Sequence, residues 1–263
     1  MRSMILAVLG LCVGMAASAH ADDWSKTFEV SGKPQLAIHT SDADIRVDTW
    51  DRSTIEARVT TENVKIGDGG ITIVELQAGN AVDLEVRFPH HFAGFNVGHH
   101  HVSIEVHMPR EGMVDLHTGD GSIQLSHLKG EMQMQTGDGH MQIDAVDGSL
   151  RARTGDGDIR AAGRFDGLDV FTGDGRIDAS AMSGSSMGSE WTLRTGDGSV
   201  ELKLPENFAA NVDLHTGDGH ITMDLPVAVE GNMRASEIRG KLNGGGNLLT
   251  IQTGDGSIRL AKL

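Results

Sequence analysis

The chain is poor in the residues that usually build and brace the core of an exported protein. It has no tyrosine, aromatic residues make up only 4% of its 263 residues, and its single cysteine is Cys12. One cysteine excludes an internal disulfide framework. The shortage of large rings predicts a thin core of Val, Ile, Leu, Met and Ala, held by packing and backbone pairing.

Basic residues are also scarce. The sequence holds 22 Lys and Arg against 37 Asp and Glu, which gives a formal net charge of −15. A surplus of negative charge argues against nucleic acid and bare anionic membrane as partners, because both are themselves anionic.

Long apolar runs are absent except at the start of the chain. Arg2 precedes an apolar stretch from Met4 to Ala17, and residues 19–21 read AHA, the form of a cleavage site. This pattern is typical of a secretory signal peptide and is too short for a membrane span. A lipoprotein anchor at Cys12 does not fit, because Leu11 stands where a small residue is needed. We expect cleavage after Ala21, export to the periplasm or to the cell surface and beyond, and no transmembrane segment in the mature chain.

The sequence TGDG, in contrast, is abundant. Copies begin at Thr118, Thr136, Thr154, Thr172, Thr195, Thr216 and Thr253, at spacings of 18, 18, 18, 23, 21 and 37 residues. In every copy the positions four and two before the threonine, and five and seven after it, are apolar. The alternating positions are polar, except at Phe171. Period-two alternation on both sides of a turn predicts two strands with one buried face each, so the fold class is all-β.

Two all-β architectures compete. TGDG could close a tight hairpin, but the resulting meander would need a second layer to cover its apolar face. Alternatively, each unit of about 18 residues is one coil of a single-chain β-solenoid, with two strands per coil and TGDG at one corner. We favour the β-solenoid because it explains the constant period. It also places the longer spacings as bulges at the far corner.

The array extends towards the N-terminus in a looser form. The segment from Leu36 to Val47 keeps the template around "TSDAD", with Asp42 where the turn aspartate would fall. We therefore divide the chain into a signal peptide (1–21), an irregular N-terminal part with a His-rich insertion (22–117), and a regular TGDG-repeat part (118–263).

We interpret TGDG as a structural turn. Its glycines would supply positive φ, its threonine would bond turn amides or the next coil, and its aspartate would accept turn N–H groups. The residues assigned to this role are Thr118, Gly119, Asp120, Gly121, Thr136, Asp138, Thr154, Asp156, Thr172, Asp174, Thr195, Asp197, Thr216, Asp218, Thr253 and Asp255.

Other uses of these aspartates fit less well. A glycosidase needs two carboxylates with different pKa values at one site, whereas every corner offers the same carboxylate, so no catalytic residue is expected. Calcium-binding β-rolls place aspartate directly before the buried aliphatic residue, and that pattern is not matched here. No cofactor is expected, although weak calcium bridging along Asp120, Asp138, Asp156 and Asp174 stays open.

Histidine is the second anomaly. Six of 13 histidines fall within "PHHFAGFNVGHHHVSIEVH", which is either an exposed polar loop and strand start or an imidazole cluster. Imidazole nitrogens suit zinc, nickel or copper. The candidate metal ligands are His90, His91, His99, His101 and His107.

These segments together resemble a known family. The carrying residues are "FEVSG", "LAIHTSDADIRVDTWDRSTIEARV", "VSIEVHMP", the serial TGDG units and the closing "GGGNLLTIQTGDGSIRL". The chain is similar over nearly its whole mature length to the bacterial putative-adhesin family of exported β-strand-repeat domains of unknown function. The resemblance implies an exported β-solenoid and an adhesin role, and it implies no catalytic residues.

Three functional hypotheses follow. The first is a non-enzymatic adhesive or scaffolding surface in the cell envelope, whose ligand is a protein or a glycan. The second is a periplasmic metal-binding or sensing module that uses the His-rich segment. The third is a carbohydrate-active β-helix protein, which would need a distinct charged groove.

Overall fold

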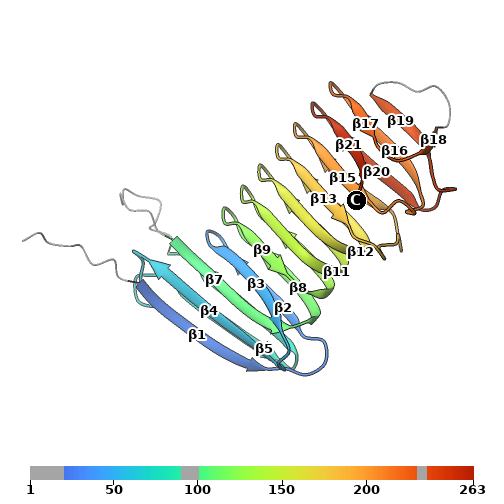
Figure 1. Cartoon of the computed structure of the whole chain (residues 1–263). Helices are drawn as coiled ribbons and strands as arrows, with labels where there is room; N and C mark the ends of the chain where they lie inside the picture. Colours follow the sequence, from blue (N-terminus) through green and yellow to red (C-terminus); the bar gives the residue numbers. More distant parts are fainter. Residues whose placement is uncertain (1–20, 90–100, 230–235) are drawn as a thin grey trace, which may run out of the picture.

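The computed structural model describes residues 21–89, 101–229 and 236–263, and these residues form strands and turns without a helix. Pairing joins 21 strands into one sheet, drawn as a long stack in Figure 1. The all-β prediction is confirmed. The expected signal peptide (except Ala21) and His90, His91 and His99 lie outside the described residues. Within the described ranges, no helix has the length and apolar character needed to span a membrane.

Two long ladders make up this sheet, and β11 and β12 belong to both because each continues round a corner. The first ladder begins with an antiparallel β5–β6 pair, continues in parallel, and ends in antiparallel pairs with β19 and β18. In spatial order it contains β5 (Thr72–Ala78), β6 (Ala81–Arg87), β2 (Gln35–Thr40), β8 (Glu111–His117), β10 (Lys129–Gln135), the second halves of β11 (Met141–Thr154) and β12 (Ile159–Thr172), β14 (Trp191–Thr195), β20 (Leu248–Thr253), β16 (Ala210–Thr216), β19 (Glu237–Leu242) and β18 (Val227–Val229).

The second ladder begins with two antiparallel pairs, β1–β4 and β4–β7, and is parallel from there on. Its spatial order is β1 (Ala21–Glu29), β4 (Thr54–Glu62), β7 (His101–Pro109), β3 (Asp44–Trp50), β9 (Ile123–Ser126), the first halves of β11 and β12, β13 (Ile177–Ala181), β15 (Val200–Leu204), β21 (Ile258–Lys262) and β17 (Ile221–Met223).

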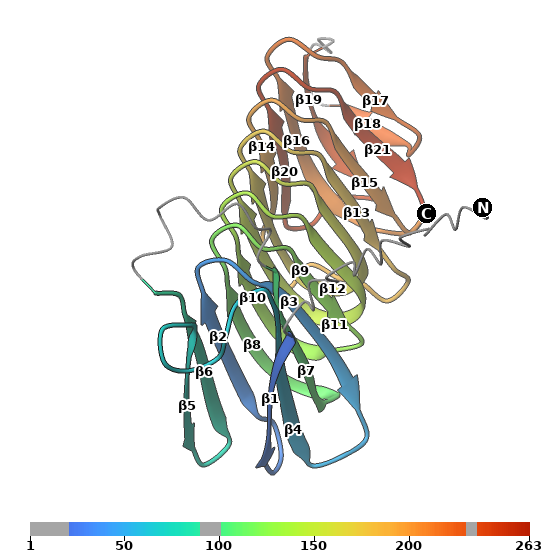
Figure 2. The same cartoon turned by 90° about the vertical axis from the view of Figure 1, so that its left-hand side faces the viewer.

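The core lies between the two ladders, and Figure 2 shows the two layers side by side. The apolar positions of the TGDG template supply its regular part, and all of them are buried except Ile221 and Met223. Those two are half-buried because, among the described strands, β17 pairs only with β21. Trp191 and Phe165 are the largest fully buried side chains and meet edge to face. Period-two patterning therefore predicts the buried face correctly.

The order of the units in space differs from their order in sequence at both ends. The early unit, β2 and β3, lies between β6/β7 and β8/β9. The last unit, β20 and β21, lies between β14/β15 and β16/β17 (Figure 1). The spacings of 21 and 37 residues are therefore not simple bulges. After β15 the chain leaves one position in each ladder open, forms β16 and β17 beyond it, and later fills it with β20 and β21. Only the 23-residue spacing is an added loop, between β13 and β14.

Candidate functional site

The threonine of each TGDG is buried and bonds to the neighbouring corner. The Thr154 hydroxyl donates to the carbonyls of Gly137 (3.1 Å) and Gly139 (3.0 Å), and it accepts the N–H of Gly157 at 3.3 Å. Corresponding bonds occur at the other copies, and every TGDG threonine is at most 5% exposed. The hydroxyl thus satisfies backbone groups that the corner would otherwise leave buried without partners.

The glycines of TGDG act differently from the sequence-based expectation. Positive φ occurs at several turn glycines elsewhere, but at none of the glycines in the seven TGDG copies. Instead, the corners stack in very close approach: a Cβ on Gly157 would lie 1.9 Å from the Gly139 carbonyl oxygen, and one on Gly155 would lie 2.6 Å from that of Gly137. Glycine is required because a side chain has no room, which corrects the prediction of left-handed backbone.

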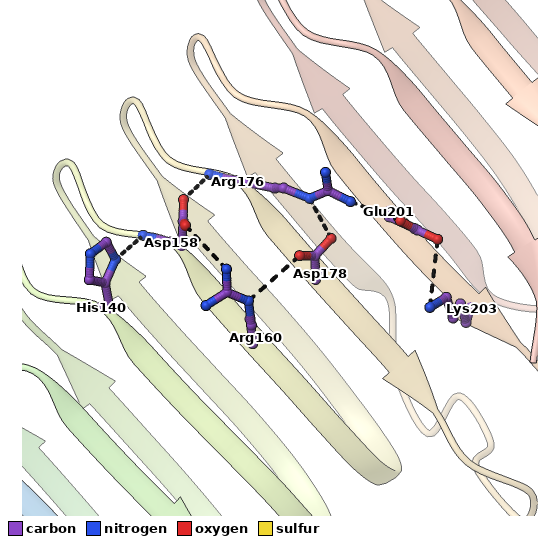
Figure 3. Close-up of polar contacts among 7 residues, drawn as sticks. All are labelled: His140, Asp158, Arg160, Arg176, Asp178, Glu201 and Lys203. Atoms are coloured by element: carbon purple, nitrogen blue, oxygen red, sulfur yellow. Dashed lines mark hydrogen bonds and ion pairs between the residues drawn. The ribbon is translucent and has the colours of Figure 1, made fainter.

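The TGDG aspartates are exposed at every corner. Among the described residues, none of the seven carboxylates takes part in a hydrogen bond or ion pair, so the expected capping role is wrong. The side chain four positions after the threonine takes that role in several copies. The Asp158 N–H donates to Nδ1 of His140 at 3.0 Å, and the Arg176 N–H donates to Oδ1 of Asp158 at 2.9 Å (Figure 3).

The threonine bonds predict a clear difference between two otherwise similar variants. Thr154→Val keeps the shape but leaves buried backbone groups without partners, so we expect a loss of about 1–3 kcal/mol in the free energy of unfolding. Thr40→Val is the matched control, because the buried Thr40 hydroxyl has no partner among the described residues; it should be neutral or stabilising. Chemical denaturation of both variants is the measurement, and equal losses would contradict the assigned bonds.

The described histidines of the candidate metal cluster do not come together. His101 and His107 lie six residues apart on β7, roughly 20 Å at the usual rise of a strand. His107 stacks on Trp50 with ring centroids 5.2 Å apart, and His101 lies 3.8 Å from an Asp44 carboxylate oxygen. In the described ranges, no three His, Cys, Asp or Glu side chains are placed to hold a metal ion. A metal role for His90, His91 and His99 stays a prediction.

The outer face of the second ladder is occupied by its own ion pairs. Figure 3 shows a chain of contacts in which Arg160 lies 3.5 Å from Asp158 and 3.9 Å from Asp178, and Arg176 contacts Asp178 at 2.6 Å and Glu201 at 2.9 Å. The hydrogen bond to Asp178 raises the pKa of Arg176. Because these charges satisfy one another, this face offers few free groups to a partner.

The outer face of the first ladder is hollowed. A groove of about 1120 Å³ crosses it from β5 to β14. The exposed Leu76 of β5 lines one end, and Ser189 and Glu190, at the end of the loop that lengthens the 23-residue spacing, line the other. Small residues such as Ser149 and Gly167 leave space in the middle of the groove.

One outward row of side chains borders this groove. It consists of the residue immediately before the TGDG threonine in each copy, together with His39 before Thr40, and we call it the pre-threonine row. Strand register places its members side by side on successive strands, all exposed except Gln252, which is half-buried. In spatial order they are His39, His117, Gln135, Arg153, Phe171, Arg194, Gln252 and His215.

The pre-threonine row contains no carboxylate, although the chain as a whole is strongly acidic. On the strands beyond its two ends, carboxylates stand in register with the row: Glu85 beside His39 and Glu237 beside His215. At its centre Phe171 is 44% exposed and lies between Arg153 and Arg194 on the adjoining strands. The Arg194 side chain has no hydrogen bond or ion pair among the described residues.

Sequence reasoning missed this row because it noted only that the outward positions are polar and did not compare them from copy to copy. The signal was present, since the residue before each TGDG reads H, Q, R, F, R, H and Q in chain order. Phe171 was already visible as the break in polar alternation. The groove had no comparable signal, because its ends depend on β5 and on the loop before β14.

Comparison with known families gives one match over most of the chain. The model described as Toastrack DUF4097 matches residues 29–190. The chain belongs to the Toastrack DUF4097 family. No curated protein matched the chain in a separate comparison.

Several solved structures are similar to this Toastrack chain at low sequence identity. A "putative cell adhesion protein" from Clostridium sporogenes is 11% identical over 93% of this chain and 100% of that one, with a TM-score of 0.45. A "putative adhesin" from Parabacteroides merdae is 13% identical over 90% and 95%, with a TM-score of 0.46. A "putative lipid binding protein" from Parabacteroides distasonis is 12% identical over 92% and 98%, with a TM-score of 0.41.

Proposed function

We propose that this Toastrack protein is a non-enzymatic, exported β-solenoid whose outer faces form an adhesive or scaffolding surface in the cell envelope. In the solenoid, one coil is a strand of the first ladder, a TGDG corner and a strand of the second ladder. The corners and the core are structural, and partner binding is left to the outward side chains.

The groove on the first ladder is the observation that carries this proposal. It is open along one side and crosses neighbouring strands of the first ladder from β5 to β14. Such a site suits a long ligand that touches many coils weakly, rather than a small substrate enclosed by a few catalytic groups. Free groups also favour the first ladder: its Arg194 guanidinium has no partner among the described residues, whereas Arg160 and Arg176 of the second ladder are both ion-paired.

Filling the groove should abolish binding without harming the fold. In the full chain, Gln133→Trp and Ser149→Trp each place a large ring on an exposed groove position. Purified protein would be incubated with isolated cell-envelope fractions, and the retained amount measured after sedimentation. We expect retention of the parent and loss of most retention in both variants.

Gln142→Trp is the matched control, because Gln142 is exposed on the first half of β11, which belongs to the second ladder. It should be retained like the parent. Equal retention of all four proteins, or no retention of the parent by any fraction, would contradict the proposed adhesive surface.

A further inference from the structure

We propose that the pre-threonine row binds a neutral, linear polysaccharide that lies along the stack and crosses the strands. This inference rests on the proposed adhesive function and names the ligand of that surface. It is carried by the side-chain chemistry of the row, by the free groups at its centre and by the charge around it.

The row is built from planar side chains: imidazole, amide, guanidinium and one phenyl ring. A sugar ring offers a C–H face that packs on an aromatic ring, and hydroxyls that both donate and accept hydrogen bonds. Phe171, with 44% of its surface exposed, supplies the packing face. The Arg194 guanidinium beside it has five N–H donors and no protein partner among the described residues.

Acceptors for the same hydroxyls lie in the next outward row. Asp115, Asp169 and Asp213 stand two residues before members of the pre-threonine row on β8, β12 and β16. Oδ2 of Asp169 accepts from Arg151 at 3.1 Å and from Arg153 at 3.2 Å, so its Oδ1 remains available. A donor row beside an acceptor row is what a hydroxyl-rich chain requires.

The surrounding charge selects a neutral chain. A polyanion would approach a protein of net charge −15 and would pass the exposed carboxylates of the TGDG corners, three positions beyond the row. A polycation would meet the unpaired Arg194 guanidinium at the centre of the row, where Asp169 is already bonded to Arg151 and Arg153. An uncharged polyol avoids both penalties.

The row also has the length and repetition of a polymer site. Eight strands separated by about 4.8 Å give a row of about 34 Å. Each strand is held by backbone pairing on both sides, so the row is ordered before the ligand arrives, which lowers the entropic cost of binding. Weak contacts repeated along one chain then add through effective concentration.

Calorimetric titration of the full chain tests the inference. The probes are cellohexaose, laminarihexaose, maltohexaose and mannohexaose as neutral chains, with polygalacturonate as the anionic comparison. We expect at least one neutral hexaose to bind more tightly than polygalacturonate. Phe171→Thr, which keeps strand preference, and Arg194→Gln should each weaken that binding about tenfold.

Arg160→Gln is the matched control, because it removes the same charge from the second ladder. It should bind as the parent does. The inference is overturned if no neutral hexaose binds, if polygalacturonate binds most tightly, or if the two row variants match the control.

The failure of this inference can be told apart from the failure of the proposed function. If no hexaose binds but envelope fractions still retain the parent and release Gln133→Trp, the sugar assignment is wrong and the adhesive surface stands. If a hexaose binds at the row but no envelope fraction retains the parent, the adhesive role is wrong instead.

Discussion

A chain that ends at Asn247, and so lacks Leu248–Leu263, is expected to lose the folded structure of its C-terminal third. The removed segment forms β20 and β21, which are interior strands of the two ladders. Its removal leaves β14 paired only with β12 and β15 only with β13, and it separates both from β16 and β17.

The size of the effect follows from burial. Leu249, Ile251, Ile258 and Leu260 are each 0% exposed. At about 1.5–3 kcal/mol per buried aliphatic side chain, their loss is roughly 6–12 kcal/mol. That is comparable with the whole stability of a typical domain, about 5–15 kcal/mol, so the strands after β15 cannot remain docked.

Tryptophan fluorescence and thermal denaturation measure this result. Trp191 is fully buried on β14, directly beside Leu249 of β20, and its emission should shift to the red in the truncated chain. A chain that lacks only the half-exposed Leu263 is the control and should resemble the parent. Emission and melting temperature unchanged by the long truncation would mean that the last unit is a dispensable end of the stack.

Gly157→Ala should be strongly destabilising, although it adds only one methyl group. Its Cβ would lie 1.9 Å from the carbonyl oxygen and 2.6 Å from the carbonyl carbon of Gly139, and both are backbone atoms that cannot rotate away. The two corners would have to separate, which breaks the Thr154 bonds as well. We expect a loss of about 3 kcal/mol, which lowers the melting temperature by roughly 6–12 °C.

Gly188→Ala is the control for this substitution. A Cβ at Gly188 would lie 3.4 Å from the Asp166 carbonyl oxygen, which is an ordinary contact. Differential scanning calorimetry of both variants compares the two sites directly. If Gly157→Ala melts with the parent, the corners do not stack as closely as the structure shows.

The fold class and the buried face could be read from the sequence because strand periodicity records which side chains face inward. Trp191, Leu193, Val200 and Leu202 were assigned to the core by that pattern, and all four are buried. The order of the units could not be read in the same way. Since the copies share one apolar template, any copy can stack on any other, and the template does not say which two copies become neighbours.

The role of the corner was only partly predictable. Period-two alternation predicts that the threonine side chain faces the core. A hydroxyl at that buried position is then expected to form hydrogen bonds with backbone groups of the corner. The reason for glycine was misjudged, because positive φ is a local property while the clash at Gly157 comes from Gly139, a residue of the neighbouring coil. The aspartate was assigned a bond that His140 and Asp158 make in its place.

The pre-threonine row could be predicted from the sequence only by aligning the TGDG copies with one another and comparing the same position in each copy. A single His117 or Arg153 before TGDG is an ordinary solvated side chain. Strand pairing places these single residues side by side in a continuous row without carboxylates. The row can be recognised only when the strand register is known. Phe171 is the one member that the sequence marks by itself.

The central claim is that the corners hold the fold while the outward row and groove bind the ligand. The most direct test is the affinity of Thr154→Val for the neutral hexaose that the parent binds, measured well below the melting temperature of the variant. We predict an affinity equal to that of the parent despite the lower stability, in contrast to Phe171→Thr, which should keep its stability and lose about tenfold in affinity. A folded Thr154→Val that loses affinity as Phe171→Thr does would contradict the separation of corner and binding face.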